Sequence, residues 1–186
     1  MGSGEATVIE TIVIIVILAV VAVAIYAASK PNRFRMERSI VIDATAERVF
    51  PLIADFHKWP QWSPWESLDP ELKRTYSGAA HGVGAIYAYE GNSKVGSGRM
   101  EITETVIPSR VVAKLDFIKP FEAHNFAEWT LTPDGKGTRV TWAMHGPQNF
   151  LFKLMGLVFN MDKTVGADFE RGLTNLKQIA ESGEAA

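Results

Sequence analysis

The sequence of 186 residues contains no cysteine, and its charges almost cancel. Disulfides, thiolate nucleophiles and cysteine-based metal sites are therefore excluded. The formal net charge is −2 at pH 7, and no basic stripe interleaved with aromatic residues occurs. We therefore expect no nucleic-acid partner. Neither an internal repeat nor a low-complexity tract interrupts the chain.

Motifs for metal, nucleotide and acyl-transfer chemistry are also missing. No Gly-x-Ser-x-Gly nucleophile elbow occurs, and Gly82-Val83-Gly84 and Gly96-Ser97-Gly98 lack the lysine and further glycine of a phosphate-binding loop. The histidines are scattered, and none is paired with a carboxylate at metal-ligand spacing. They are His57, His81, His124 and His145. We therefore expect no metal and no cofactor.

One acid/base pair can be considered, and it is weak. Glu104 and His124 could exchange protons if both side chains reached an interior site. Strand alternation does not place them on a common inward face, so exposed surface positions are the more frequent reading. No catalytic residue is assigned from the sequence.

The N-terminal part holds one long apolar run. No charged residue occurs in residues 11–28, and Val8 and Ile9 extend the run. Eighteen helical residues reach about 27 Å, close to the thickness of a hydrocarbon core. A bilayer also favours a helix because backbone hydrogen bonds must close within the segment. The run predicts a single transmembrane helix over residues 8–28.

A cleaved secretory signal is the alternative for this segment. A signal has a basic start and a shorter apolar core, whereas this chain begins with Glu5 and Glu10 and no basic residue. An uncleaved anchor is therefore the favoured reading. Basic residues follow the span at Lys30, Arg33, Arg35 and Arg38. By the positive-inside rule we expect a single-pass protein of the cell membrane with its C-terminal domain in the cytoplasm.

After the span we expect a linker (29–33), one domain (34–181) and a disordered tail (182–186). Period-two alternation and turn residues predict seven strands, with two short helices after the first. The expected strands cover residues 34–42, 72–77, 85–90, 98–106, 110–119, 122–132 and 138–145.

Residues 149–181 carry an apolar residue every three or four positions, which is typical of a long helix with one buried stripe. The stripe contains Val158, Met161, Val165, Phe169, Leu173, Leu176 and Ile179. Such a helix needs a broad apolar surface, and the strands supply one. The sequence predicts an α+β fold in which a curved antiparallel sheet of seven strands grips a long C-terminal helix.

Alternation along the strands assigns two faces. The inward face collects Tyr87, Tyr89, Met100, Ile102, Leu115, Phe117, Trp129, Leu131, Val140, Trp142 and Met144. The solvent face carries Arg99, Glu101, Lys114, Asp116, Glu128, Arg139 and Thr141. Because one helix covers only part of a curved sheet, a gap can remain beside it.

The element order and several local strings resemble the START-like (SRPBCC) superfamily of helix-grip domains, which includes Bet v 1-like folds. The resemblance is to its polyketide cyclase/dehydrase and lipid-transport group and covers residues 34–181. The strings are Ala54-Asp55-Phe56 with Trp59, Trp62, Ser63, Pro64 and Trp65; residues 96–102; residues 138–142; and Met161-Asp162-Lys163 with Gly166, Asp168-Phe169, Gly172-Leu173 and Asn175-Leu176-Lys177. The resemblance implies a cavity for a hydrophobic ligand between helix and sheet.

Ten residues are candidates for contacting this ligand. They are Tyr87, Tyr89, Met100, Leu115, Phe117, Asn125, Trp129, Trp142, Val165 and Phe169. Aromatic walls with a few polar anchors are typical of ligand sites, although the same residues could simply fill the core.

The sequence thus predicts a membrane-anchored domain that binds or transfers a hydrophobic small molecule or lipid. A cyclase- or dehydratase-like enzyme acting on an apolar substrate in the same cavity is the alternative. A third possibility is a protein-interaction role without a ligand.

Two apolar stretches remain open to two readings. The tryptophan passage 59–65 either packs two short helices onto the sheet or gates the cavity and touches lipid headgroups. Residues 150–159 form either a mobile lid that admits a lipid or touches the bilayer, or the buried first turns of the long helix. Gly156 makes a helix break there plausible.

Overall fold

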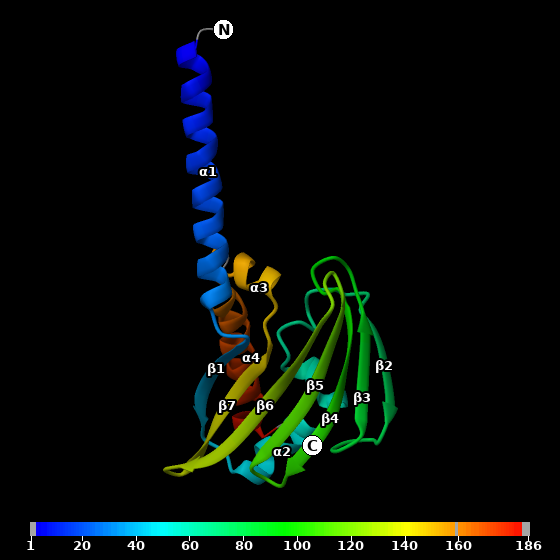
Figure 1. Cartoon of the computed structure of the whole chain (residues 1–186). Helices are drawn as coiled ribbons and strands as arrows, with labels where there is room; N and C mark the ends of the chain where they lie inside the picture. Colours follow the sequence, from blue (N-terminus) through cyan, green and yellow to red (C-terminus); the bar gives the residue numbers. More distant parts are fainter. Residues whose placement is uncertain (1–2, 159, 184–186) are drawn as a thin grey trace. The chain divides into compact units, whose positions relative to one another are not determined.

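The computed structural model describes residues 3–158 and 160–183 (Figure 1). The chain divides into two compact units. The first contains Met1–Arg33 and Gln148–Asn160, and the second contains Phe34–Pro147 and Met161–Ala186. Of the expected tail, residues 184–186 lie outside the described residues, as does Phe159 in the stretch after the last strand.

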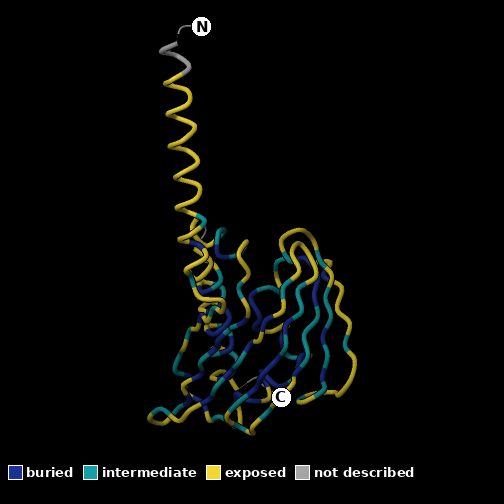
Figure 2. Tube along the Cα trace, in the orientation of Figure 1, coloured by how far each residue is buried: buried dark blue, intermediate teal, exposed yellow. Residues whose placement is uncertain are grey.

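The first unit is built on one long apolar helix, α1 (Ser3–Ser29). Its large apolar side chains from Val8 to Tyr26 are exposed, as the yellow trace in Figure 2 shows. Within the described residues, Thr7–Ser29 is the one helix long and apolar enough to cross a membrane. Length and composition fit a membrane anchor and a signal sequence equally. A short helix, α3 (Phe150–Met155), packs against α1 in the same unit.

The second unit contains the predicted antiparallel sheet of seven strands, in the order β1-β7-β6-β5-β4-β3-β2. The strands are β1 (Arg33–Ile42), β2 (Lys73–Gly78), β3 (Ala85–Glu90), β4 (Ser97–Val106), β5 (Arg110–Lys119), β6 (Ala123–Asp134) and β7 (Gly137–Pro147). The helix α2 (Ala46–Ala54) and the 3-10 helix η1 (Phe56–Gln61) follow β1. The predicted fold class is therefore confirmed.

The long C-terminal helix is confirmed, but its predicted start at residue 149 is wrong. The helix α4 runs over Met161–Ser182 and is separate from α3. The Asn149 side chain caps α3 by accepting a hydrogen bond from the Phe152 N–H at 2.9 Å, and Gly156 ends that helix. Glycine lowers helix propensity by about 1 kcal/mol relative to alanine, which favours a break there.

The buried stripe of α4 is correspondingly shorter than the predicted one. Phe169, Leu173, Leu176 and Ala180 are buried, whereas Val158 precedes the helix and Met161 is exposed at its first position.

The helix α4 lies at the β1–β7 end of the sheet. It packs against β7, and Arg38 of β1 forms ion pairs with Asp162 and Glu170 of α4. The ammonium of Lys177 donates to the Val41 carbonyl of β1 at 2.7 Å. The helix α2 packs on β5 and β6. In Figure 1, β3 and β4 lie at the other end of the sheet from α4, in agreement with the strand order.

The opposite face of the sheet carries the predicted charged residues, which form ion pairs. Arg99 pairs with Glu101 at 2.8 Å, and Lys114 pairs with Asp116 at 3.0 Å. Glu128 accepts from Arg110 at 2.7 Å and from Arg35 at 3.3 Å. Burial alone would raise the pKa of Glu128, but these hydrogen bonds outweigh it and lower the pKa below its ordinary value.

Candidate ligand-binding site

The register of the sheet brings the candidate residues into neighbouring rows on the inward face. Tyr87 of β3 lies opposite Met100, Met100 lies opposite Leu115, and Leu115 lies opposite Asn125. The next row contains Tyr89, Gly98 and Phe117. Trp129 and Trp142 form a directly opposed pair on β6 and β7. The remaining two candidates, Val165 and Phe169, come from α4.

These ten side chains are not equally accessible. Six are buried: Tyr87, Leu115, Asn125, Trp129, Trp142 and Phe169. Four are half-buried and pack against the core: Tyr89, Met100, Phe117 and Val165. Three of those four lie on β3, β4 and β5, in the part of the sheet that α4 leaves uncovered. The inward face is therefore closed at Trp129, Trp142 and Phe169 and less buried at Tyr89, Met100 and Phe117.

The absence of a side chain at Gly98 determines how the Tyr89 ring lies on this face of the sheet. A Cβ atom at Gly98 would lie 2.6 Å from the Tyr89 hydroxyl oxygen and 2.8 Å from the Asp116 carbonyl oxygen. Glycine at this position therefore lets the Tyr89 ring cross β4 close to its backbone. Burial raises the pKa of Tyr89 to about 12, so its hydroxyl stays protonated at neutral pH.

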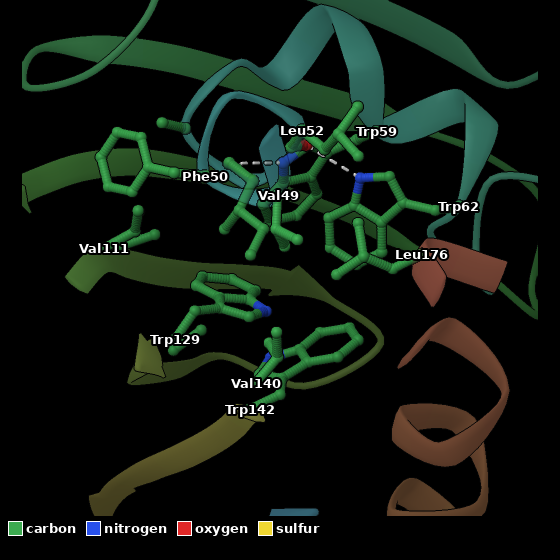
Figure 3. Packing of buried hydrophobic residues seen from close by; sticks show 14 of the residues in the cluster. Val49, Phe50, Leu52, Trp59, Trp62, Val111, Trp129, Val140, Trp142 and Leu176 are labelled. Atoms are coloured by element: carbon green, nitrogen blue, oxygen red, sulfur yellow. Dashed lines mark hydrogen bonds between the residues drawn. The ribbon is translucent and has the colours of Figure 1, made fainter. Parts of the chain in front are cut away.

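The closed end is an aromatic cluster (Figure 3). The Trp142 ring stacks on Phe169 with centroids 4.3 Å apart and planes 4° apart. Trp129 and Trp142 lie 5.2 Å apart, and Trp62 meets both rings edge-on. Aromatic pairs of this kind add about 0.5–1.5 kcal/mol each beyond the area that they bury.

The tryptophan passage belongs to this cluster, which confirms the packing reading for its first two indoles. Trp59 donates to the Ile53 carbonyl at 3.0 Å, and Trp62 donates to the Leu52 carbonyl at 2.9 Å. Both carbonyls belong to the last turn of α2, where helices leave acceptors unpaired. These tryptophans therefore bind the end of α2 to the core.

Trp129 and Trp142 differ from Trp59 and Trp62 in one respect. Both have a buried indole nitrogen, Nε1, that has no hydrogen-bond partner among the described residues. An unpaired buried donor costs about 1–3 kcal/mol, so such groups are rare in native interiors and call for an explanation. Two of them occur here on directly opposed residues of the candidate site.

A polar group that the sequence analysis missed also lies in this region. The Tyr87 hydroxyl donates to Glu66 Oε1 at 2.6 Å, and Arg74 donates to the other oxygen of Glu66 at 2.6 Å. Burial, reinforced by the hydrogen bond to Glu66, raises the pKa of Tyr87 well above its ordinary value. Glu66 lies in an irregular segment, where no periodic pattern assigns a side chain to a face.

The considered pair Glu104 and His124 does not belong to the site. Glu104 pairs with Arg110, and His124 Nδ1 lies 2.7 Å from Asp116 Oδ1 on the charged face of the sheet. Both side chains are exposed, which confirms the surface reading. Among the described residues, no three histidine, aspartate or glutamate side chains gather in a way that could hold a metal ion.

Known proteins of similar fold support a common architecture. The chain resembles protein CV1439 from Chromobacterium violaceum, with a TM-score of 0.57, 16% identity and coverage of 82% of this chain and 99% of that one. It also resembles the di-domain ARO/CYC StfQ from the steffimycin biosynthetic pathway, with a TM-score of 0.60 and 12% identity over 83% of this chain and 52% of that one. Ara h 8.0201 matches with a TM-score of 0.55 and 9% identity over 81% and 99%.

Identities this low establish the fold alone. No curated protein sequence matches the chain. The family model described as "Polyketide cyclase / dehydrase and lipid transport" matches residues 33–181, which is most of the chain. The chain therefore belongs to the polyketide cyclase / dehydrase and lipid transport family.

Proposed function

We propose that this protein is a membrane-anchored domain that binds a hydrophobic small molecule or lipid on the inward face of its sheet. The ten candidate residues would contact the ligand. The observation that carries the proposal is the pair of buried, unpartnered indole N–H groups of Trp129 and Trp142. They lie in an aromatic wall that continues to the half-buried side chains Tyr89, Met100 and Phe117.

The polar groups of this face define the chemistry of the ligand. The indole N–H groups are donors only, and the Tyr89 hydroxyl stays protonated. A ligand with an apolar body and an acceptor oxygen, such as a ketone, ester or acyl carbonyl, would satisfy donors that are otherwise unpaired. Apolar burial at about 25 cal/mol per Å² would supply most of the affinity, and the hydrogen bonds would set orientation.

Entry would take place at the β3–β5 end of the sheet. Tyr89, Met100 and Phe117 are half-buried there, and Met100 can change rotamer at low cost because its side chain is unbranched. At the other end, α4 and the aromatic cluster close the face.

The anchor in this proposal is α1. Its exposed apolar surface has the length of a bilayer core. At its end, Lys30 lies over the Tyr26 ring at 4.3 Å and donates to the Tyr26 hydroxyl at 2.8 Å. Tyrosine and lysine both favour the membrane–water interface. The basic residues that follow the span, Lys30, Arg33 and Arg35, favour a cytoplasmic domain.

A cyclase- or dehydratase-like enzyme is the second candidate, and the Tyr87–Glu66 contact favours it. A protonated tyrosine hydroxyl held 2.6 Å from a carboxylate could pass a proton to or from a reacting oxygen. The fold is also that of the di-domain ARO/CYC StfQ, which comes from the steffimycin biosynthetic pathway.

The identity of the ligand can be tested by extraction. The full-length protein is purified in detergent, extracted with organic solvent, and the extract is analysed by mass spectrometry. We expect a defined apolar compound that carries an acceptor oxygen. Recovery of a compound that changes on renewed incubation would favour the enzyme, and an empty extract from protein that binds no probe would contradict both.

The site is tested with an environment-sensitive naphthalene probe. Tyr89→Ala and Trp129→Phe should weaken probe binding about fivefold to tenfold, since each removes about one hydrogen bond or one wall of the site. The control is Lys114→Ala on the opposite face of the same sheet, which should bind normally. Equal effects from all three variants would contradict the assignment of the site.

A further inference from the structure

The segment that joins the last strand to α4 has an inverted distribution of side chains. Residues 150–158 contain one charged residue, Lys153, and it is buried with 6% of its surface exposed. Four apolar residues of the segment are exposed instead, and Val158 reaches 80%. The others with large exposure are Phe150, Leu151 and Leu157. In a segment that faces water we would expect an exposed lysine and buried apolar residues, because lysine is among the least buried residue types.

Two hydrogen bonds to one residue hold this segment at the end of α1. Lys153 Nζ donates to the side-chain oxygen of Asn32 at 2.6 Å. The Gln148 N–H donates to the Asn32 carbonyl at 2.8 Å. The helix α3 also packs against α1, and Ala27 near the end of α1 is fully buried. All these groups belong to the first unit of the chain, so the segment has a defined place beside the last turn of α1.

This place is the level at which a spanning helix leaves the hydrocarbon core. Tyr26 and Lys30 mark the same level at the end of α1, because Tyr26 directly precedes the buried Ala27 and Lys30 follows it by three residues. Apolar side chains held at that level face the acyl-chain and headgroup boundary. Because Lys153 is turned toward Asn32, the large exposed side chains of residues 150–158 are all apolar, as contact with acyl chains requires.

We infer that residues 150–158 are a second membrane-contacting element, which lies in the bilayer interface with Phe150, Leu151, Leu157 and Val158 inserted among lipids. The inference rests on the proposed anchor, since α1 supplies the reference level. The segment follows β7 and precedes α4, so it connects the bilayer surface to the two elements that carry Trp142 and Phe169.

Site-directed spin labelling tests the inference directly, because the natural chain has no cysteine to remove. Leu151→Cys and Val158→Cys are each labelled with a nitroxide in the full-length protein in phosphatidylcholine and phosphatidylglycerol nanodiscs. Both positions are exposed, so the label should leave the packing intact. Collision rates are measured with oxygen, which concentrates in lipid, and with a water-soluble nickel chelate.

The expected result is a collision rate at least severalfold higher with oxygen than with the chelate at both positions. Ile14→Cys, in the middle of α1, is the lipid control, and Lys136→Cys, in the exposed turn between β6 and β7, is the water control. A lipid signal at Ile14 with a water signal at 151 and 158 overturns the inference and leaves the anchor standing. A water signal at Ile14 overturns the anchor and the inference together.

A second copy of the chain is the competing occupant of this surface. It would protect Leu151 and Val158 from both collision partners and would produce spin–spin broadening that disappears on dilution with unlabelled protein. That outcome also overturns the inference. Broadening should be absent if lipid covers the segment.

Discussion

Single residues determine how closely α4 can approach the sheet, and Gly172 shows this best. A Cβ atom at Gly172 would lie 2.8 Å from the Trp142 ring and 2.9 Å from Pro64 Cδ. Neither neighbour can yield easily, because Trp142 is also stacked on Phe169 and Pro64 is a rigid ring. The absence of a side chain at this one position therefore allows the contact between helix and aromatic cluster.

We predict that Gly172→Ala lowers the free energy of unfolding by about 1–3 kcal/mol through overpacking. This direction opposes intrinsic helix propensity, which favours alanine over glycine by about 1 kcal/mol. Denaturant unfolding of the full-length protein in detergent, followed by tryptophan fluorescence, measures the change. The control Gln178→Ala on the exposed face of α4 should stay within about 0.5 kcal/mol of the parent. A more stable Gly172→Ala protein would show that the helix packs more loosely than described.

The position of each inward side chain was predictable from the sequence, whereas its accessibility was not. Alternation alone puts Tyr89 and Trp129 on the same face, because strand periodicity is a backbone property. The difference between half-buried Tyr89 and buried Trp129 depends on which helix lies over which strand. The unpaired indole nitrogens and the partner of Tyr87, Glu66, likewise depend on contacts between residues distant in the sequence.

At the scale of elements, α2 depends on the tryptophans that follow it. Trp59 and Trp62 occupy carbonyls at its C-terminal end, although the helix has only nine residues and could not persist alone in water. Trp62 and Trp129 form a matched pair, because they are 1% and 0% exposed in one cluster and only Trp62 has a hydrogen-bond partner among the described residues.

We predict that Trp62→Phe destabilises the protein by about 1–2 kcal/mol more than Trp129→Phe does, since it leaves the Leu52 carbonyl without its donor. Both substitutions remove the same volume, so the cavity cost largely cancels in the comparison. Thermal unfolding followed by circular dichroism gives the two values. Equal losses would indicate that Trp129 has an acceptor in solution, and that outcome would weaken the ligand proposal.

The element pattern was predictable except for one break. The periodicity of apolar residues predicts the seven strands and the apolar stripe of the helix, and the turn residues predict where each strand ends along the chain. Gly156 made a break plausible, but one helix from residue 149 was predicted because Val158 and Met161 continue the apolar spacing across the separation of α3 from α4. Periodicity cannot distinguish apolar residues that face a sheet from apolar residues that are exposed. The buried Lys153, paired with Asn32 from the other end of the chain, reveals the difference only in three dimensions.

At the scale of the whole molecule, the fate of α1 decides between anchor and signal sequence. We predict that protein purified from membranes keeps the entire apolar helix, so that its intact mass equals that of the full chain. Intact-protein mass spectrometry measures this. A mature form that begins after α1 would establish a signal sequence and would end the anchor proposal.

The orientation of the domain is tested with vesicles prepared from the same membranes. Inside-out vesicles should expose the domain to added protease, whereas right-side-out vesicles should protect it.

The strand order has a further consequence for biosynthesis. Among the strands that the structure describes, β1 pairs only with β7, the last strand, which follows about a hundred residues later. At roughly 5–20 residues per second, the ribosome needs about 5–20 seconds to deliver that neighbour. The apolar helix leaves the ribosome long before then, so under the proposed membrane anchoring the nascent chain would meet the translocation machinery while β1 still lacks a neighbour. The sheet would then be completed on a chain whose N-terminal helix is already held in the membrane.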